Sequence, residues 1–179
     1  LNLNPYWTAP KSIILKDIIP LMRKNPSYLA DNKILLFDSS NQLVDPTAVD
    51  WSTDEAGNYR FRQEPGRINA MGSVKINFPN PHAVYMHDTP QKGLFNKLLR
   101  FDSSGCVRVK NVRDLLVWLA KQTPGGGRSE IERIIASGDR TDLKLAEPVP
   151  VYFTYISAWS TSDGVVQFRD DIYQRDGVD

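Results

Sequence analysis

The sequence predicts an α+β fold: a predominantly β body with peripheral helices and a small, mostly helical capping subdomain near its start. Val74–Phe78 alternates apolar and polar side chains, as a half-buried strand does. Val112–Leu119 places its apolar side chains on one helical face. The segment before Gly72 instead contains short helical patterns and turns. At 179 residues, the whole chain 1–179 fits one domain with a substantial core.

The N-terminal part predicts an extended lead-in followed by helices and one strand. Prolines within Leu1–Pro10 favour extended backbone there. Ser12 is placed to cap a helix that continues to Met22, and Pro20 inside it predicts a kink or two short helices. The next elements are expected to be a turn at Pro26–Leu29, a strand at Lys33–Phe37 and a turn at Asp38–Asn41.

A capping subdomain is expected over approximately residues 11–60 (Lys11–Arg60). The stretch Asp45–Pro65 is polar, with Trp51, Tyr59 and Phe61 as isolated anchors. The whole segment Lys11–Arg60 is long for a plain connection between two elements, and long insertions of this kind often form lids over binding sites. A peripheral subdomain that only adds stability is the alternative, and the sequence leaves both open.

The second half predicts the strands and helices of the body. Ala83–His87 reads as a strand that ends on its histidine, and Asn111 is placed to cap the helix Val112–Leu119. The run Pro124–Gly127 ends that helix. The remaining elements are a short helix at Leu94–Leu99, a helix capped by Ser129 and running through Ile135, and two late strands at Val149–Ser157 and Val165–Phe168.

The composition excludes several classes of function. The net charge is +1 with scattered Lys and Arg, so a nucleic-acid partner is not expected. No apolar stretch is long enough to span a bilayer, so no membrane contact is expected from this fragment. The single cysteine excludes an internal disulfide. The chain begins at Leu1 without a methionine or a leader, which favours a fragment or processed product.

Cys106 is the candidate nucleophile. A thiol needs a nearby base to ionise, and His87 at a strand end can supply one. Gly105 can leave backbone N–H groups free to face a developing oxyanion. Taken alone, a lone cysteine is more often a small buried hydrophobe, and Gly105 could serve only a tight turn. Ser104 and Arg108 nevertheless give the cysteine polar surroundings that a core residue would lack.

No metal or other cofactor is expected. One cysteine with His82 and His87 does not give zinc-ligand spacing. The glycine run Gly125–Gly127 lacks the Lys-Ser/Thr that follows a phosphate-binding loop, so it reads as a hinge.

Two runs together resemble the signature of the YkuD-type L,D-transpeptidase catalytic domain. They are Tyr85–Pro90 (YMHDTP) and Ser103–Arg108 (SSGCVR), with 19 positions from His87 to Cys106. Other stretches resemble the large YcbB-type subgroup, which carries a capping subdomain: Asn4–Pro10, Gln63–Gly66, Asn69–Gly72 and Phe168–Tyr173. The similarity covers nearly the whole chain. Many members have histidine before the Gly-Cys pair where this chain has Ser104, and the subgroup commonly has serine there.

The resemblance implies a role for each motif residue. Cys106 would attack, His87 would take its proton, and the backbone carbonyl of Asp88 would orient the imidazole. N–H groups around Gly105 would form the oxyanion hole, helped by the Tyr85 hydroxyl, and Ser104 would belong to this catalytic loop. Arg108 would hold a substrate carboxylate.

The resemblance also implies a substrate and a compartment. The substrates would be peptidoglycan stem peptides: a thioester forms with release of D-Ala, and an amine then resolves it to give a 3→3 cross-link. Carbapenem β-lactams would act as covalent inhibitors. The location would be periplasmic, with the full-length protein anchored in the inner membrane as the subgroup usually is.

Three other functions compete with this one. A sortase-like cysteine transpeptidase also uses His, Cys and Arg, but its arginine usually lies well downstream of the cysteine. A papain-like hydrolase fits less well because there the cysteine precedes the histidine. A non-catalytic cell-wall-binding module on the same fold is the alternative outside enzymes.

Overall fold

A computed structural model describes residues 1–103 and 105–177 of the chain. They form two compact units, Leu1–Pro148 and Val149–Asp179. The first unit contains two separate hydrophobic cores, one in the body and one in the segment predicted as the cap. The mixture of sheets and helices confirms the α+β prediction and the mostly β body.

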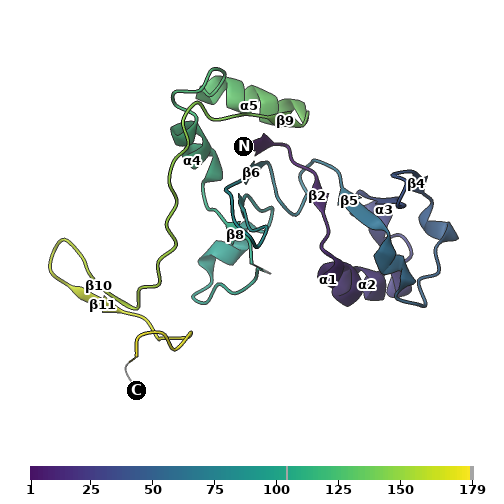
Figure 1. Ribbon diagram of the computed structural model, residues 1–179, viewed down its shortest axis with the longest axis horizontal. Coiled ribbons are helices and arrows are strands. Elements are labelled where there is room, and N and C mark those ends of the chain that lie inside the picture. The colour runs from purple at the N-terminus through teal and green to yellow at the C-terminus, as the bar shows by residue number, and fades with distance from the viewer. Residues whose placement is uncertain (104, 178–179) are drawn as a thin grey trace. The chain divides into compact units, whose positions relative to one another are not determined.

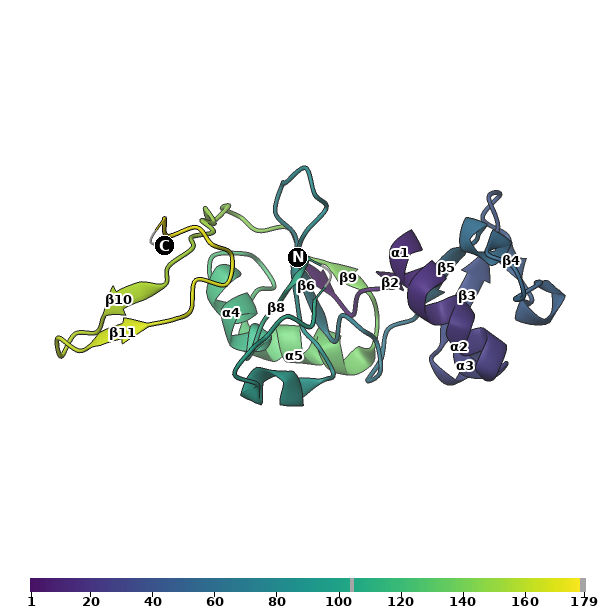
Figure 2. The same cartoon turned by 90° about the horizontal axis from the view of Figure 1, so that it is seen from below.

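A five-stranded sheet forms the centre of the body (Figures 1 and 2). Neighbouring strands are antiparallel except for the parallel pair β7–β8. The order across the sheet is β8 (Val107–Arg108), β7 (Met86–His87), β6 (Val74–Ile76), β1 (Asn2–Leu3) and β9 (Thr141–Asp142). Strands far apart in the sequence, β1 and β9, thus pair in one sheet, which sequence patterning did not indicate.

The strand predicted at Ala83–His87 is present but shorter. Asn80 explains this, because its side-chain amide donates to the carbonyl of Val84 and its oxygen accepts from the Val84 N–H. Ala83 also has a positive φ of 52°. This turn uses the backbone groups that a longer strand would pair, so the ladder begins only at Met86.

Two helices pack against the sheet, as Figures 1 and 2 show. They are α4 (Val112–Leu119) and α5 (Arg128–Ser137). Their buried side chains join those of the strands in one core: Leu3, Val74, Ile76, Val112, Leu116, Ala120 and Ile131. Both helices were predicted, and the 3-10 helix η4 (Lys92–Asn96) lies close to the helix expected at Leu94–Leu99.

The predicted caps of these helices are wrong in detail. Asn111 occupies the N-cap position of α4, but its side chain makes no capping hydrogen bond there. Its φ of 54° is left-handed, a conformation that asparagine tolerates. Ser129 lies inside α5, whose N-cap is Gly127. The glycine run therefore contributes the start of α5, so the serine that follows is already helical.

The segment predicted as the cap combines helices with an antiparallel four-stranded sheet. The sheet order is β2 (Trp7–Thr8), β5 (Arg60–Gln63), β3 (Ile34–Phe37) and β4 (Leu43–Val44). The helices are α1 (Lys11–Ile13), the π-helix η1 (Ile14–Ile18), α2 (Ile19–Lys24), α3 (Tyr28–Asp31) and the 3-10 turns η2 (Pro46–Ala48) and η3 (Glu55–Asn58). Ile14, Ile18, Leu29, Leu36 and Phe61 are among the side chains buried in its core.

The first helix shows how the chain accommodates Pro20. The residue lies at the start of α2, directly after the π-helical turn η1. A wider turn before a proline removes the need for the N–H that proline lacks. The prediction of a divided helix is thus confirmed, but Ser12 is not its cap, because it lies within α1 and Pro10 takes the N-cap position.

Strand β5 was missed because most of its side chains are polar. Phe61 is fully buried, while Gln63 is buried through hydrogen bonds from its amide to the carbonyls of Asn32 and Ile68. A buried glutamine that satisfies backbone groups interrupts the apolar alternation by which a strand is recognised.

The C-terminal unit contains a β-hairpin of β10 (Ala158–Ser160) and β11 (Val166–Phe168). The strand β11 confirms the prediction for Val165–Phe168. The strand predicted over Val149–Ser157 is wrong, since these residues have no regular structure and most of them are exposed. An apolar run needs a partner strand to become part of a sheet, and within this unit the only pairing found in the described residues is the hairpin.

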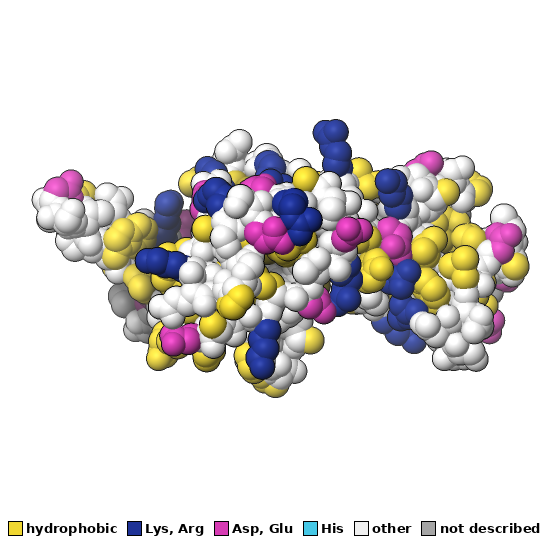
Figure 3. Space-filling model, turned by 90° about the horizontal axis from the view of Figure 1, so that it is seen from above, with side chains coloured by type: hydrophobic (Ala, Val, Ile, Leu, Met, Phe, Trp, Pro, Cys, Tyr) yellow, Lys and Arg dark blue, Asp and Glu magenta, His cyan; other side chains and the backbone are white. Residues whose placement is uncertain are grey.

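The described surface carries mixed charge. On the face in Figure 3, dark blue Lys and Arg lie interspersed with magenta Asp and Glu. Within residues 1–103 and 105–177, none of the helices has the length and apolarity needed to cross a bilayer.

Candidate active site

One face of the central sheet carries most of the predicted site residues. In the ladder, Lys75 pairs with His87, and His87 pairs with Arg108. Paired residues project to the same face, and side chains alternate along each strand. Tyr85 and Cys106, two residues earlier on the neighbouring segments, therefore share this face. The opposite face is apolar and packs against α4 and α5.

His87 is held in one orientation by its neighbour. The ring is buried, and its Nδ1 lies 2.5 Å from the carbonyl oxygen of Asp88. A carbonyl only accepts, so Nδ1 carries the proton and Nε2 presents a lone pair. Burial lowers the pKa of His87, and the nearby positive charges of Arg108 and Lys75 lower it further. The hydrogen bond to Asp88 and the charge of Asp88 raise it, but the net effect is a lowered pKa. The neutral imidazole can therefore act as a base.

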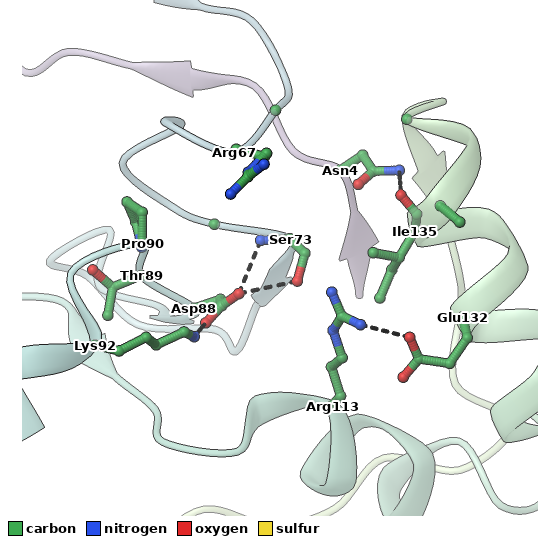
Figure 4. Close-up of a pocket in the computed structure, with 14 residues that line it drawn as sticks. Asn4, Arg67, Ser73, Asp88, Thr89, Pro90, Lys92, Arg113, Glu132 and Ile135 are labelled. Carbon is green, nitrogen blue, oxygen red and sulfur yellow. Dashed lines mark hydrogen bonds and ion pairs between the residues drawn. The ribbon is translucent and has the colours of Figure 1, made fainter.

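The Asp88 carboxylate fixes the turn that presents this carbonyl. Its Oδ2 accepts from the Ser73 N–H at 3.1 Å and from the Ser73 hydroxyl at 3.0 Å, and Lys92 forms an ion pair with Oδ1 (Figure 4). Burial opposes ionisation of Asp88, but the Lys92 and Ser73 hydrogen bonds hold its pKa below the ordinary value. The network anchors the turn to the start of β6.

Gly72 makes room for this carboxylate. Its φ is +58°, and a Cβ at this position would lie 2.5 Å from Asp88 Oδ2. Any other residue would therefore be strained in its backbone and would displace the aspartate. Gly72 and Ser73 support the site, and the sequence alone did not indicate that role for either.

Cys106 lies half-buried beside Tyr85. The Val107 N–H donates to the Tyr85 carbonyl at 2.9 Å, which places the cysteine next to the tyrosine. Burial raises the pKa of Tyr85 to about 12, and the neighbouring Cys106 sulfur acts in the same direction. The phenol therefore stays protonated at neutral pH and can donate towards the sulfur.

A cavity of about 250 Å³ gives access to the sulfur. Its lining residues are Leu94, Phe95, Arg100, Asp102, Ser103, Cys106, Val107 and Arg108. Larger cavities of about 440 Å³ (drawn in Figure 4) and 520 Å³ lie beside the Asp88 carboxylate instead. The thiol is therefore not sealed in the hydrophobic core.

His87 and Cys106 share the sheet face but are not directly paired. The register pairs His87 with Arg108, two residues beyond the cysteine. Two residues of a strand span about 6–7 Å. An imidazole and a thiol side chain that lean towards each other, or one bridging water, can cover that separation.

The loop before Cys106 is closed by Ser103. The Ser103 hydroxyl accepts from the Gly105 N–H at 3.2 Å and donates to the Cys106 carbonyl at 2.5 Å. Gly105 has a φ of +129°, which favours glycine. The Gly105 N–H is thus engaged by Ser103 in this structure, and its place in an oxyanion hole stays a prediction. Ser104 lies outside the described residues.

Arg108 has an unused donor. Its Nη1 donates to the Asp102 carbonyl at 2.8 Å, whereas its buried Nε has no hydrogen-bond partner in the described part of the chain. The residue lines the Cys106 cavity and also a cavity of about 230 Å³. That second cavity includes Tyr28, Asn32 and Gln63 from the segment predicted as the cap and the strand that follows it. A carboxylate in either cavity could meet the guanidinium group of Arg108.

Lys75 is a charged residue of this face that the sequence did not mark as part of the site. Its Nζ lies 4.1 Å from the centroid of the Tyr85 ring. The alternation in Val74–Phe78 did place Lys75 on the polar face, but the pairing with His87 depends on a register that the sequence does not display. As for metals, the described residues contain no group of three or more His, Cys, Asp or Glu side chains that could hold an ion.

Comparisons with known proteins point to one family. The profile of the YkuD family, described as the L,D-transpeptidase catalytic domain, matches residues 1–140. A Haemophilus influenzae protein named "Putative L,D-transpeptidase" is 37% identical over 168 residues, which cover 93% of this chain and 34% of that protein. The chain thus spans about a third of the length of this curated relative. On this evidence, the chain belongs to the YkuD family of L,D-transpeptidase catalytic domains.

Proposed function

We propose that this domain is a cysteine-dependent L,D-transpeptidase that forms 3→3 cross-links in peptidoglycan. One observation carries the proposal: a neutral imidazole, oriented through Nδ1 by the Asp88 carbonyl, shares a sheet face with the half-buried thiol of Cys106. Family membership supports the transpeptidase class.

In the first half-reaction, Nε2 of His87 takes the Cys106 proton. The sulfur attacks the carbonyl carbon between the third residue of a tetrapeptide stem and its terminal D-Ala. Collapse of the tetrahedral intermediate breaks the amide bond, the imidazolium protonates the leaving amine, and D-Ala departs. The product is a thioester on Cys106.

In the second half-reaction, the side-chain amine of a neighbouring stem attacks the thioester carbonyl. His87 takes a proton from the amine, the carbon–sulfur bond breaks, and Cys106 is restored. Backbone N–H groups around Gly105 and Cys106, with the Tyr85 hydroxyl, stabilise the oxyanion in both steps, and one such donor contributes roughly 3–4 kcal/mol. Ser104 belongs to the same loop in this proposal.

Arg108 and the cap supply substrate binding. The guanidinium of Arg108, a residue that lines the cavity at the sulfur, is suited to a stem-peptide carboxylate. The cavity that the arginine lines together with Tyr28 and Asn32 supports a place for the cap in the substrate site. The proposal places the domain in the periplasm, where its substrate lies, and includes acylation of Cys106 by carbapenems.

The test is product analysis with a tetrapeptide stem as donor and acceptor. The wild-type chain is expected to release D-Ala and yield a 3→3 cross-linked dimer, whereas Cys106→Ala yields neither. Release of D-Ala without a dimer would replace the transpeptidase with a hydrolase. A chain that binds the stem but turns over none of it would favour a cell-wall-binding module.

A further inference from the structure

Lys75 lies in the middle of the site rather than at its edge. On β6 it pairs with His87 of β7. The Asp88 N–H donates to the Val74 carbonyl at 2.9 Å, so the adjacent pair, Lys75 with His87, is the non-hydrogen-bonded one. Side chains of such pairs approach more closely than those of hydrogen-bonded pairs.

The ammonium group of Lys75 contacts Tyr85, which lies next to Cys106. Its Nζ lies 4.1 Å from the Tyr85 ring centroid, a cation–π distance. The Tyr85 carbonyl in turn accepts from the Val107 N–H at 2.9 Å, which places Cys106 next to Tyr85. Lys75, Tyr85 and Cys106 thus follow one another across three neighbouring segments.

Lys75 takes part in none of the close ion pairs that join side chains within residues 1–103 and 105–177. Burial lowers the pKa of Lys75, the Cys106 charge opposes that effect, and Arg140 adds to it. The anion best placed to balance this half-buried cation is therefore the thiolate.

The other charged groups around the pair are cationic or are already engaged. Arg140 is bound to Asp142 through both carboxylate oxygens, and the Asp88 carboxylate is bound to Lys92. The groups that face Cys106 and Lys75 from the neighbouring segments are Tyr85 and His87 at β7, Arg108 on β8, Arg100 and Asp102 around the sulfur cavity, and Arg140 before β9.

We propose that Lys75 is a positioning residue for the reaction: its ammonium holds the Tyr85 ring beside the sulfur, and its charge favours the thiolate of Cys106 over the thiol. This inference rests on the proposed function. Lys75 neither gives nor takes a proton in the scheme, because the thiol proton still moves to Nε2 of His87. Removing the positive charge while keeping the chain length makes the thiolate harder to form.

The test measures alkylation of Cys106 by iodoacetamide as a function of pH, followed by intact mass. The chain has one cysteine, so the added mass reports that site alone. The variants are Lys75→Met and Lys75→Gln, which remove the charge, and Lys75→Arg, which keeps it. Lys121→Met is the matched control, since Lys121 is exposed and lies just beyond α4.

In the neutral variants, the pH of half-maximal alkylation is expected to rise by about one unit, which lowers the rate below that pH roughly tenfold. Lys75→Arg and Lys121→Met should stay close to wild type. Two results would overturn the proposal: a profile in both neutral variants equal to wild type, or a loss in Lys75→Arg as large as in Lys75→Met. Thermal unfolding of each variant identifies any that fails to fold.

The same samples separate this inference from the proposed function. Alkylation needs no peptidoglycan chemistry, whereas release of D-Ala from a tetrapeptide does. If wild type releases no D-Ala while the alkylation shift appears, the transpeptidase assignment fails and the electrostatic role of Lys75 is still observed. Normal D-Ala release with no shift would reject Lys75 alone.

Discussion

Gly72 offers a sharp test of how the site is held together. Replacement by alanine would place a Cβ 2.5 Å from Asp88 Oδ2 at a backbone φ of +58°. The left-handed conformation alone costs a non-glycine residue about 1–2 kcal/mol. Displacing the carboxylate also breaks at least one of its two hydrogen bonds from Ser73, and a bond to a charged group is worth about 1.5–3 kcal/mol.

The expected loss of unfolding free energy in Gly72→Ala is therefore about 2.5–5 kcal/mol. Gly125→Ala is the matched control, because Gly125 has a φ of +77° and no atom lies within 4 Å of the place that an added Cβ would occupy. It should lose only the backbone contribution of about 1–2 kcal/mol. Urea unfolding of both variants measures the difference.

The same substitution should also impair catalysis. Moving Asp88 moves the carbonyl that accepts from His87 Nδ1, so the imidazole loses its fixed tautomer. General-base catalysis contributes about 10²–10⁴-fold, and acylation of Cys106 by a tetrapeptide is expected to slow by at least about 10². Equal urea midpoints for the two alanine variants, together with unchanged acylation, would refute the idea that Gly72 positions Asp88.

Two further predictions concern His87 and Arg108. Because burial lowers the pKa of His87, acylation should persist as the pH falls below 6.5 and decline only when the pH passes through the lowered pKa. As the pH falls, His87 of the unfolded chain takes up its proton before His87 of the folded chain does. The free energy of unfolding should therefore also fall across this pH window, and less so in His87→Gln. A pH-rate profile that declines already at or above 6.5 would contradict this. Arg108→Gln should raise KM for a stem peptide by about tenfold or more with a smaller change in kcat, since a charged hydrogen bond to the substrate carboxylate is lost. An unchanged KM would exclude Arg108 from binding.

The motif residues could be found from the sequence because their chemistry is local. A histidine at the end of an apolar strand and a cysteine after glycine were recognisable, and β7, which contains His87, pairs with β8, which directly follows Cys106. The helix α4 was equally clear from its apolar face. Each of these features depends on residues within a few positions of one another.

The supporting residues could not be found because they depend on pairing. Lys75 meets His87 only through the β6–β7 register, and Ser73 reaches Asp88 only once the turn has closed. The exposed run Val149–Ser157 shows the reverse case, since its apolar side chains indicated a strand for which the described part of its unit has no partner. Local patterning predicts which residues can pair, whereas the neighbouring strand decides whether they do.

The central claim is that Cys106 is acylated with the help of His87. The most direct measurement is the intact mass of the chain after exposure to a tetrapeptide stem without an amine acceptor. The wild type should gain the mass of the acyl tripeptide, His87→Ala should gain it far more slowly, and Cys106→Ala should gain nothing. Acylation of Cys106→Ala, or an equal rate in His87→Ala, would contradict the account.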